Sequence, residues 1–377
     1  MMETFRQMVN DCIRIGLENN VSSMKKLCIH SYHRLLPYDI QTKYRLTAIS
    51  QAAGRLSQMK RDIKKGNKPK SPYVKKPYLV SCYGFKVNAR LLSFPLRNRE
   101  FTNIILNDYV TSIVSDISIK VRSFTLTPTS LSLSVAKEVE PIKPTKVMGI
   151  DRNLRNVTLG NSQKIIQINT SELLKIKENT TCVYSAFKRN DARIRKSLAN
   201  KLMNRRTRRI KQRLHLISKL VVQLAKKENA AIIFEDLKGI RKLYRKGNGQ
   251  GSKYRRKLNS WSFYELERQV VYKSNWEAIP VCFVDPRRTS ILCPICGDRT
   301  QEDRERRRKL WCGNCGKSMD RDVVAAMNIS YKGMHRFCIS QGDTDEAMVQ
   351  ERGSNFAKAK LIPPILKVDV SKVKLLA

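Results

Sequence analysis

The stretch CPICGDRTQEDRERRRKLWCGNCGKSMDRD, residues 293–322, carries two chemical signals that together decide how the chain folds. It holds two Cys-x-x-Cys pairs separated by 15 residues, and an Asp-Arg-Asp follows a few residues after the last cysteine. Each pair brings two thiolates to one metal, and four thiolates complete a closed tetrahedral site. The spacing therefore predicts a structural zinc site, with iron as the alternative metal. Its ligands would be Cys293, Cys296, Cys312 and Cys315.

The chain as a whole is strongly basic. Its 377 residues include 74 Lys and Arg against 32 Asp and Glu, a formal net charge of +42. Such a surplus predicts a polyanionic partner, and nucleic acid is favoured because binding releases its condensed counterions. No apolar run of about 18 residues is present, so a membrane partner is not expected. Six further cysteines lack any framework spacing, which predicts a reduced, cytoplasmic protein.

The pattern of apolar residues changes twice along the chain. Residues 1–77 show helical spacing up to about residue 60 and then a Lys-Pro-Gly-rich linker, whereas residues 78–145 contain short β-prone runs. From residue 146 onward, apolar strands such as VMGID, AAIIFED and PVCFVD alternate with helical patterns, among them residues 188–228. This alternation predicts an α/β core. The tail, residues 333–377, has no recognisable motif.

Acidic residues in the third region stand at the ends of predicted elements. Asp151 ends the strand VMGI, Glu235 ends AAIIF, and Asp320 and Asp322 precede the helical stretch VVAAMNIS. Carboxylates that converge repel one another unless divalent cations bind between them, and Mg²⁺ or Mn²⁺ suits oxygen ligands. Two such ions can promote hydrolysis of a phosphodiester. Taken one at a time, these residues fit ordinary helix caps and strand-end turns better than a metal site.

Several blocks of this chain resemble the TnpB family, whose members are encoded by small bacterial and archaeal insertion sequences. The blocks are GIDRNLRNVTLGN, IIFEDLKGI, FYELERQVVYKSNWEAIPVCFVDPRRTSILCPICG and DRDVVAAMNI. The resemblance is strong over residues 146–330 and limited to general layout before them. It implies an RNA-guided DNA endonuclease related to the type V CRISPR effectors, with a guide RNA from its own locus and a double-stranded DNA target.

The resemblance also implies an architecture and a set of site residues. The expected domains are a helical recognition segment (1–77), a β-barrel-like wedge (78–145), an RNase H-like RuvC core (146–290), an inserted zinc ribbon (291–318), a last RuvC segment (319–332) and a tail (333–377). Asp151, Glu235 and Asp322 are the expected catalytic carboxylates and ligands of Mg²⁺ or Mn²⁺. Asp320 is expected to cap the following helix or to support the site.

Two departures from the family pattern predict reduced activity. Val324 stands where the family has a polar residue, so we expect an apolar side chain near the carboxylates. Phe5 falls within the first predicted helix, where the family has a wedge strand, which predicts an incomplete wedge. Two other functions therefore remain open: an RNA-guided DNA-binding protein that does not cleave, and an unguided zinc-ribbon nucleic-acid-binding protein.

Basic residues are dense along the helical pattern 188–228. We expect them to contact nucleic-acid phosphates, with a solvated face of a structural helix as the alternative. An apolar stripe from Leu198 to Leu220 should pack that helix. In the following loop, Tyr244, Tyr254 or Trp261 could stack on bases, although Trp261 is equally suited to the core. The candidate nucleic-acid-binding residues are Arg193, Arg195, Lys196, Lys201, Arg205, Arg206, Arg208, Arg209, Lys211 and Arg213.

Overall fold

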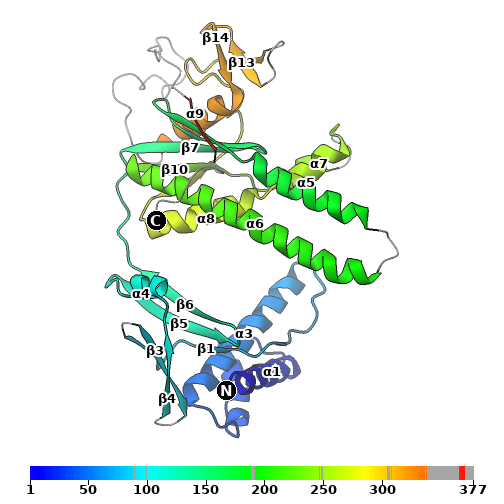
Figure 1. Cartoon of the computed structure of the whole chain (residues 1–377), viewed down its shortest axis with the longest axis vertical. Coiled ribbons are helices and arrows are strands. Elements are labelled where there is room, and N and C mark those ends of the chain that lie inside the picture. Colours follow the sequence, from blue (N-terminus) through cyan, green and yellow to red (C-terminus); the bar gives the residue numbers. More distant parts are fainter. Residues whose placement is uncertain are drawn as a thin grey trace. The chain divides into compact units, whose positions relative to one another are not determined.

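The computed structural model describes residues 1–88, 90–97, 100–187, 192–245, 247, 249–303, 306, 308–335, 337 and 365–369. The chain divides into two compact units, Met1–Glu138 and Val139–Ala377 (Figure 1). None of the helices among the described residues is long and apolar enough to cross a lipid bilayer.

The first unit opens with helices, as the apolar spacing predicts. Their bounds are α1 Met2–Glu18, α2 Met24–Ser31, the 3-10 helix η1 His33–Leu35 and α3 Thr42–Lys64. Phe5, Met8 and Cys12 lie on one face of α1, and Ala48 and Ala52 lie on one face of α3; all five are fully buried. Because both helices are amphipathic, they bury these faces against each other.

Two small antiparallel sheets complete the first unit, in the orders β1-β5-β6 and β2-β3-β4. The strands are β1 Leu79–Ser81, β2 Lys86–Asn88, β3 Leu91–Arg97, β4 Glu100–Ile105, β5 Ile119–Thr127 and β6 Ser130–Lys137. A short helix that the sequence did not predict, α4 Asp108–Val114, lies among them and is capped by the Asn107 side chain. Leu79 and Phe124 belong to the same apolar cluster as Phe5, so helices and strands share one core.

A six-stranded mixed sheet forms the centre of the second unit, in the order β11-β10-β7-β8-β9-β15. Its strands are β7 Lys146–Arg152, β8 Asn156–Gly160, β9 Ile165–Asn169, β10 Ala230–Glu235, β11 Val281–Val284 and β15 Ile365–Asp369. Strand β10 lies parallel to both β7 and β11, whereas β8 is antiparallel to its neighbours β7 and β9. Strand β15 adds an edge strand from the tail, where the sequence showed no motif.

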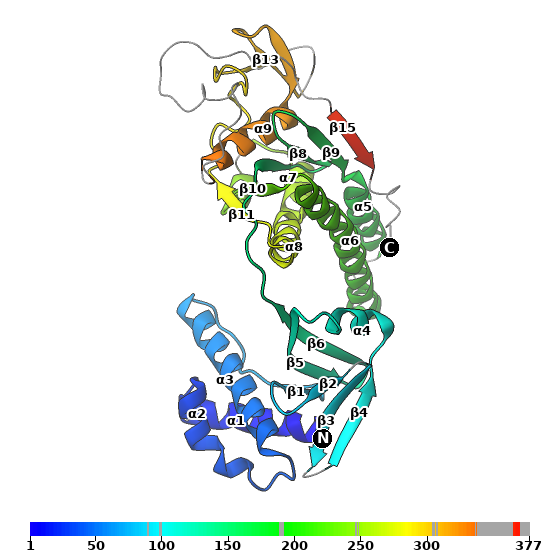
Figure 2. The ribbon, with the colours of Figure 1, turned by 90° about the vertical axis from the view of Figure 1, so that its left-hand side faces the viewer.

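Helices cover both faces of this sheet (Figures 1 and 2). The helices of this unit are α5 Ser171–Ala186, α6 Ala192–Lys227, the 3-10 helix η2 Ile240–Tyr244, α7 Ser252–Ser260, α8 Phe263–Trp276 and α9 Arg321–Met334. Met148 and Ile150 of β7 cluster with residues of α6 and α8. Val147 clusters instead with Ile233 of β10 and Ile329 of α9. The alternation follows from the two-residue period of a strand, and it places α9 on the face opposite α6 and α8.

A small three-stranded sheet lies between β11 and α9 in the sequence. Its strands are β12 Gln301–Glu302, β13 Lys309–Cys312 and β14 Lys317–Asp320, paired antiparallel in that order. Strand β14 ends at Asp320 and α9 begins at Arg321, so no linker separates the small sheet from the helix.

Helix α9 lies directly on the backbone of β7. A Cβ atom placed on Gly149 would lie 2.1 Å from the carbonyl oxygen of Ala326 and 2.5 Å from the amide nitrogen of Ser330. Only glycine lets a helix and a strand approach this closely. Gly149 therefore determines how near the start of α9 comes to the end of β7.

We predict that Gly149→Ala lowers the free energy of unfolding of the second unit by about 3 kcal/mol, because α9 must move away from β7. The matched control is Gly54→Ala in α3, where an added Cβ meets nothing within 4 Å. This control should be neutral or stabilising by up to about 1 kcal/mol, since alanine favours helix. Urea denaturation followed by fluorescence measures both, and equal effects of the two substitutions would contradict the prediction.

Candidate functional site

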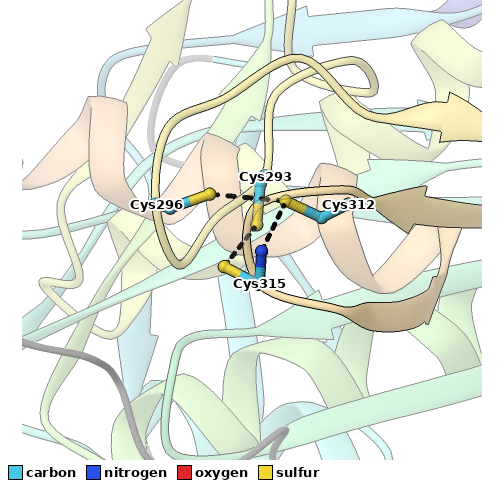
Figure 3. A group of neighbouring side chains, drawn as sticks. All are labelled: Cys293, Cys296, Cys312 and Cys315. Carbon is cyan, nitrogen blue, oxygen red and sulfur yellow. Dashed lines mark hydrogen bonds between the residues drawn. The ribbon is translucent and has the colours of Figure 1, made fainter.

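The four predicted cysteines come together at one end of the small sheet (Figure 3). Their sulfur atoms all lie within 4.8 Å of one another; Cys293 Sγ is 3.9 Å from Cys315 Sγ, and Cys296 Sγ is 3.4 Å from Cys312 Sγ. A tetrahedral zinc site with bonds of about 2.3 Å separates its sulfurs by about 3.8 Å. The described geometry therefore fits a tetrahedral metal ion with four sulfur ligands.

The turns that carry the cysteines also resemble metal-binding knuckles. The backbone N–H of Ile295 points to Cys293 Sγ, and that of Cys315 points to Cys312 Sγ, each at 3.5 Å. Gly297 and Gly316 have positive φ values of 77° and 61°, which a side chain would make costly. Among the described residues, no other set of three or more Cys, His, Asp or Glu gathers its ligand atoms so tightly.

The three predicted carboxylates come from three elements that meet on one face of the central sheet. Asp151 lies two residues after Gly149 on β7, and Glu235 lies two residues after Ile233 on β10, so both side chains point to the face that α9 covers. Asp322 lies in the first turn of α9. Strands β7 and β10 are parallel and in register, which puts Asp151 and Glu235 at the same edge of the sheet.

The negative charges of Glu235 and Asp322 both act on Asp151. Burial and the negative charges of Glu235 and Asp322 raise its pKa to about 8. The side-chain amide of Asn153 donates a hydrogen bond of 2.6 Å to Asp151 Oδ2 and partly offsets this effect. The site therefore resists holding three negative charges without a cation nearby.

Glu235 is buried and held by its neighbours. The hydroxyl of Thr289 donates a hydrogen bond of 2.6 Å to Glu235 Oε1, and burial raises the pKa of this carboxyl despite that bond. Arg152 makes no direct ion pair with the Glu235 carboxylate, although its charge lowers the pKa of that group. Its guanidinium donates to the backbone oxygen of Glu235 at 2.7 Å and pairs with Glu267 at 2.6 Å. This arginine fixes the end of β10 instead.

Asp322 has the most polar contacts of the three. Asn156 Nδ2 donates to Oδ2 at 2.9 Å, and Arg308 Nη2 lies 2.6 Å from Oδ1 and 2.7 Å from Oδ2. Asp320 accepts a hydrogen bond of 2.8 Å from the backbone N–H of Asp322, which confirms the predicted helix cap. Four of these neighbours were not predicted from the sequence, because none stands in a spacing that marks a site: Asn153, Asn156, Thr289 and Arg308.

Val324 does not lie where we expected it. It is fully buried in the apolar cluster around the cysteines, with Ile295, Leu310 and Met319. On a helix, a residue two positions after Asp322 points to a different side, so Val324 packs the small sheet onto α9 instead of facing the carboxylates.

The basic face of α6 is only partly described. The side chains of Arg193, Arg195 and Lys196 lie outside the described residues. Those of Lys201, Arg205, Arg208, Arg209 and Lys211 are exposed, Arg206 is half-buried, and half-buried Arg213 pairs with Glu172 at 2.9 Å. Such exposure is compatible with contacts to phosphates.

The structure tests two further predictions: which residues of the apolar stripe of α6 are buried, and which aromatic residues are exposed enough to stack on bases. Ile210, Leu214 and Ile217 pack into the core, but Leu198 is 39% exposed because that end of the helix extends beyond the sheet. Trp261 is a core residue at 2% exposure, which leaves it no free face for a base. Tyr254 remains exposed.

Sequence comparisons relate this chain to known proteins. The sequence model of the Cas12f1-like TNB domain matches residues 263–329, from α8 through the cysteines into α9. The TnpB-like protein MJ0751 of Methanocaldococcus jannaschii is 32% identical over 249 residues, which is 61% of this chain and 85% of that protein. The CRISPR-associated endodeoxyribonuclease Cas12f1 of Sulfoacidibacillus thermotolerans is 32% identical over 117 residues, 31% of this chain and 25% of that protein.

A solved structure shares the fold. The cryo-EM structure of a Cas12f1–sgRNA–target DNA complex aligns with a TM-score of 0.56 at 14% identity, over 87% of this chain and 80% of that chain. This similarity confirms the predicted multidomain arrangement of helices and sheets at the level of the fold.

The raised pKa of Asp151 gives a prediction for stability. An acid whose pKa rises from about 4 to about 8 on folding binds its proton more tightly when folded, so it opposes folding increasingly as pH rises between these values. Asp151→Asn should therefore raise the melting temperature by a few degrees at about pH 8 and change it little at about pH 4.

The matched control is Asp236→Asn. Asp236 is the neighbour of Glu235, but hydrogen bonds from the backbone and side chain of Lys238 lower its pKa. This substitution should bring no gain at the higher pH. Thermal melting without added divalent cations measures all three proteins, and a gain of Asp151→Asn that is the same at both pH values would contradict the prediction.

Proposed function

The chain belongs to the TnpB family, and we propose that it is an RNA-guided DNA endonuclease of a transposable element. Its reaction is the hydrolysis of target-DNA phosphodiester bonds at Asp151, Glu235 and Asp322. Three carboxylates at one edge of the sheet carry the proposal: burial, together with the negative charges of Glu235 and Asp322, raises the pKa of Asp151. A cluster of this kind is stabilised by the divalent cations that phosphodiester hydrolysis requires.

Mg²⁺ or Mn²⁺ held by these carboxylates would activate a water molecule and stabilise the leaving oxygen. The chain itself sets the geometry. Thr289 orients Glu235, Asn153 orients Asp151, and Asn156 orients Asp322 through direct hydrogen bonds. These neutral donors fix the carboxylate oxygens without cancelling their charge, so the site keeps its attraction for cations.

The cysteine cluster has a separate, structural role in this proposal. Four thiolates leave no open position on a tetrahedral zinc ion, so the ion would hold the turns together and take no part in hydrolysis. Its effect on the reaction is indirect: the small sheet continues into α9, and α9 carries Asp322. In this reading the small sheet is the zinc ribbon inserted in a RuvC domain.

Guide RNA and double-stranded DNA are the proposed partners. The net charge of +42 and the exposed cations of α6 suit contacts to the phosphates of an RNA–DNA duplex, which a protein recognises by shape and charge. Base pairing by the RNA then selects the target. We assign the helices and sheets of the first unit to recognition and wedge functions.

We predict that RNA from the chain's own locus, with Mg²⁺, directs cleavage of a plasmid that carries the matching target beside a randomised flank. Glu235→Gln should reduce the cleavage rate more than about 100-fold, because it removes a cation ligand with little change of shape. Asp236→Asn, an adjacent acid that pairs with Lys238 on the surface, should retain the rate.

Each of the other outcomes would indicate a different function of this chain or a different assignment of the site. Guide-dependent DNA binding without cleavage in the wild-type chain would identify a non-cleaving guided binder. Tight DNA binding that needs no RNA would identify an unguided zinc-ribbon protein. Undiminished cleavage by Glu235→Gln would contradict the assignment of the carboxylates.

A second prediction concerns the cysteines. The purified chain should carry about one zinc ion, and Cys312→Ser should lose it, since three thiolates hold zinc much less tightly than four. Cys182→Ser, at an exposed cysteine of α5, is the matched control and should keep the metal. Elemental analysis by mass spectrometry measures both, and full zinc content in Cys312→Ser would be inconsistent with the four-cysteine site.

A further inference from the structure

Arg308 connects the tip of the small sheet to the carboxylate site. It stands in the charged stretch RERRRK, residues 304–309, between the two cysteine pairs. Its Nη2 atom contacts both carboxylate oxygens of Asp322, at 2.6 Å and 2.7 Å. The carboxylate is only 5% exposed, whereas the arginine side chain is 55% exposed. A surface cation therefore reaches into a buried acidic site.

The backbone holds Arg308 in this position. Strands β13 and β14 pair Lys309 with Asp320, so the next residues outward, Arg308 and Arg321, face each other. The N–H of Arg321 donates a 2.9 Å hydrogen bond to the Arg308 carbonyl oxygen. Arg308 has a φ of 74°, an unfavourable value for a residue with a side chain, which persists only where surrounding contacts enforce it.

Other acids of the site also attract the guanidinium of Arg308 electrostatically. Although burial opposes it, the charges of Asp322, Asp320 and Asp151 raise the pKa of the guanidinium. Arg308 thus supplies a positive charge to the carboxylates, as a bound cation would. Because one nitrogen atom lies against both oxygens of Asp322, a cation that ligates these oxygens from the same side must displace that nitrogen.

We propose that Arg308 is a positioning residue that competes with the divalent cation for Asp322, so that the tip of the small sheet sets how tightly the carboxylate site binds its cation. This inference rests on the proposed function, because it takes the carboxylates as cation ligands. The Arg308 side chain is free to leave Asp322 when a cation takes its place, since it is already half exposed and gains hydration when it leaves.

The test is Mn²⁺ binding to the full chain without RNA or DNA, measured by the electron paramagnetic resonance of free Mn²⁺. Binding at the carboxylates is taken as the part that Asp322→Asn abolishes. Arg308→Ala should tighten this binding about tenfold, because it removes a positive charge in contact with the ligand. Arg308→Lys keeps the positive charge on a shorter side chain, so its Mn²⁺ affinity should lie between that of Arg308→Ala and that of the wild type.

Two controls keep the result interpretable. Arg306→Ala removes the same charge from the same tip but leaves the Arg308–Asp322 pair intact, so its Mn²⁺ affinity should match the wild type. Zinc content reports whether the small sheet is folded in each variant, and thiolate ligands favour zinc over Mn²⁺. The DNA cleavage assay adds a second readout: Arg308→Ala should need less Mn²⁺ for half-maximal rate.

The proposal is overturned if folded Arg308→Ala binds Mn²⁺ no more tightly than the wild type, or if Arg306→Ala tightens binding equally. The result is independent of guided cleavage. A chain that cleaves nothing but gains Mn²⁺ affinity on Arg308→Ala would support the competition and count against the proposed nuclease activity. If the chain cleaves its target and Arg308→Ala leaves the Mn²⁺ requirement unchanged, the result would support the nuclease activity and count against the competition.

Discussion

The contact between α9 and the backbone of β7 is the constraint on which the second unit depends. At Gly149 the helix approaches so closely that a single Cβ atom would meet the carbonyl of Ala326. This approach brings the first turn of α9 to the end of two parallel strands. Side chains at such strand ends are held by a backbone that the sheet fixes, which makes this edge a common location for active sites. Asp322 reaches the other two carboxylates only because glycine occupies position 149.

Convergence of three acids creates an electrostatic cost that the fold offsets incompletely. Asn153, Asn156 and Thr289 donate hydrogen bonds to the carboxylates, but they bring no charge. The guanidinium of Arg152, the basic residue next to Asp151, donates to the backbone oxygen of Glu235 and pairs with Glu267. Among the residues that the structure describes, Arg308, on the surface tip of the small sheet, brings a positive charge into contact with a carboxylate of the site. The site is therefore acidic by construction, and a cation-dependent reaction is the chemistry that such a site suits.

The sequence predicted the features that depend on local patterns. Alternating or continuous apolar runs located β7, β10 and β11, and the cysteine spacing located the cluster, because each signal lies within a few residues. Features that depend on long-range packing were missed. The tail strand β15 is defined by its pairing with β9, and Leu198 looked like a core position because periodicity cannot show where a helix leaves the sheet.

The carboxylate site shows even more clearly that local sequence patterns do not reveal long-range contacts. Strand ends and the family resemblance suggested which acids to combine, but their contacts depend on pairings that no spacing reveals. Arg308 is one of four arginines in five residues, and the register of β13 with β14 selects it. Val324 was misplaced because its position was inferred from the family pattern around Asp322, whereas the helical turn moves it to the cysteine cluster. In such sites, the face of the element matters more than proximity in the chain.

The direct junction between β14 and α9 explains why the Asp-Arg-Asp follows the cysteines so closely. Asp320 is both the last residue of β14 and the cap of α9, so the strand and the helix share one residue and cannot move independently. The cysteine cluster fixes the turn between β13 and β14, the pairing of these strands fixes Arg308, and the cap fixes Asp322. A small sheet held by four cysteines thereby determines the position of a carboxylate and of its counter-ion. The small sheet with its four cysteines thus takes part in building the carboxylate site, although none of its cysteines lies among the carboxylates.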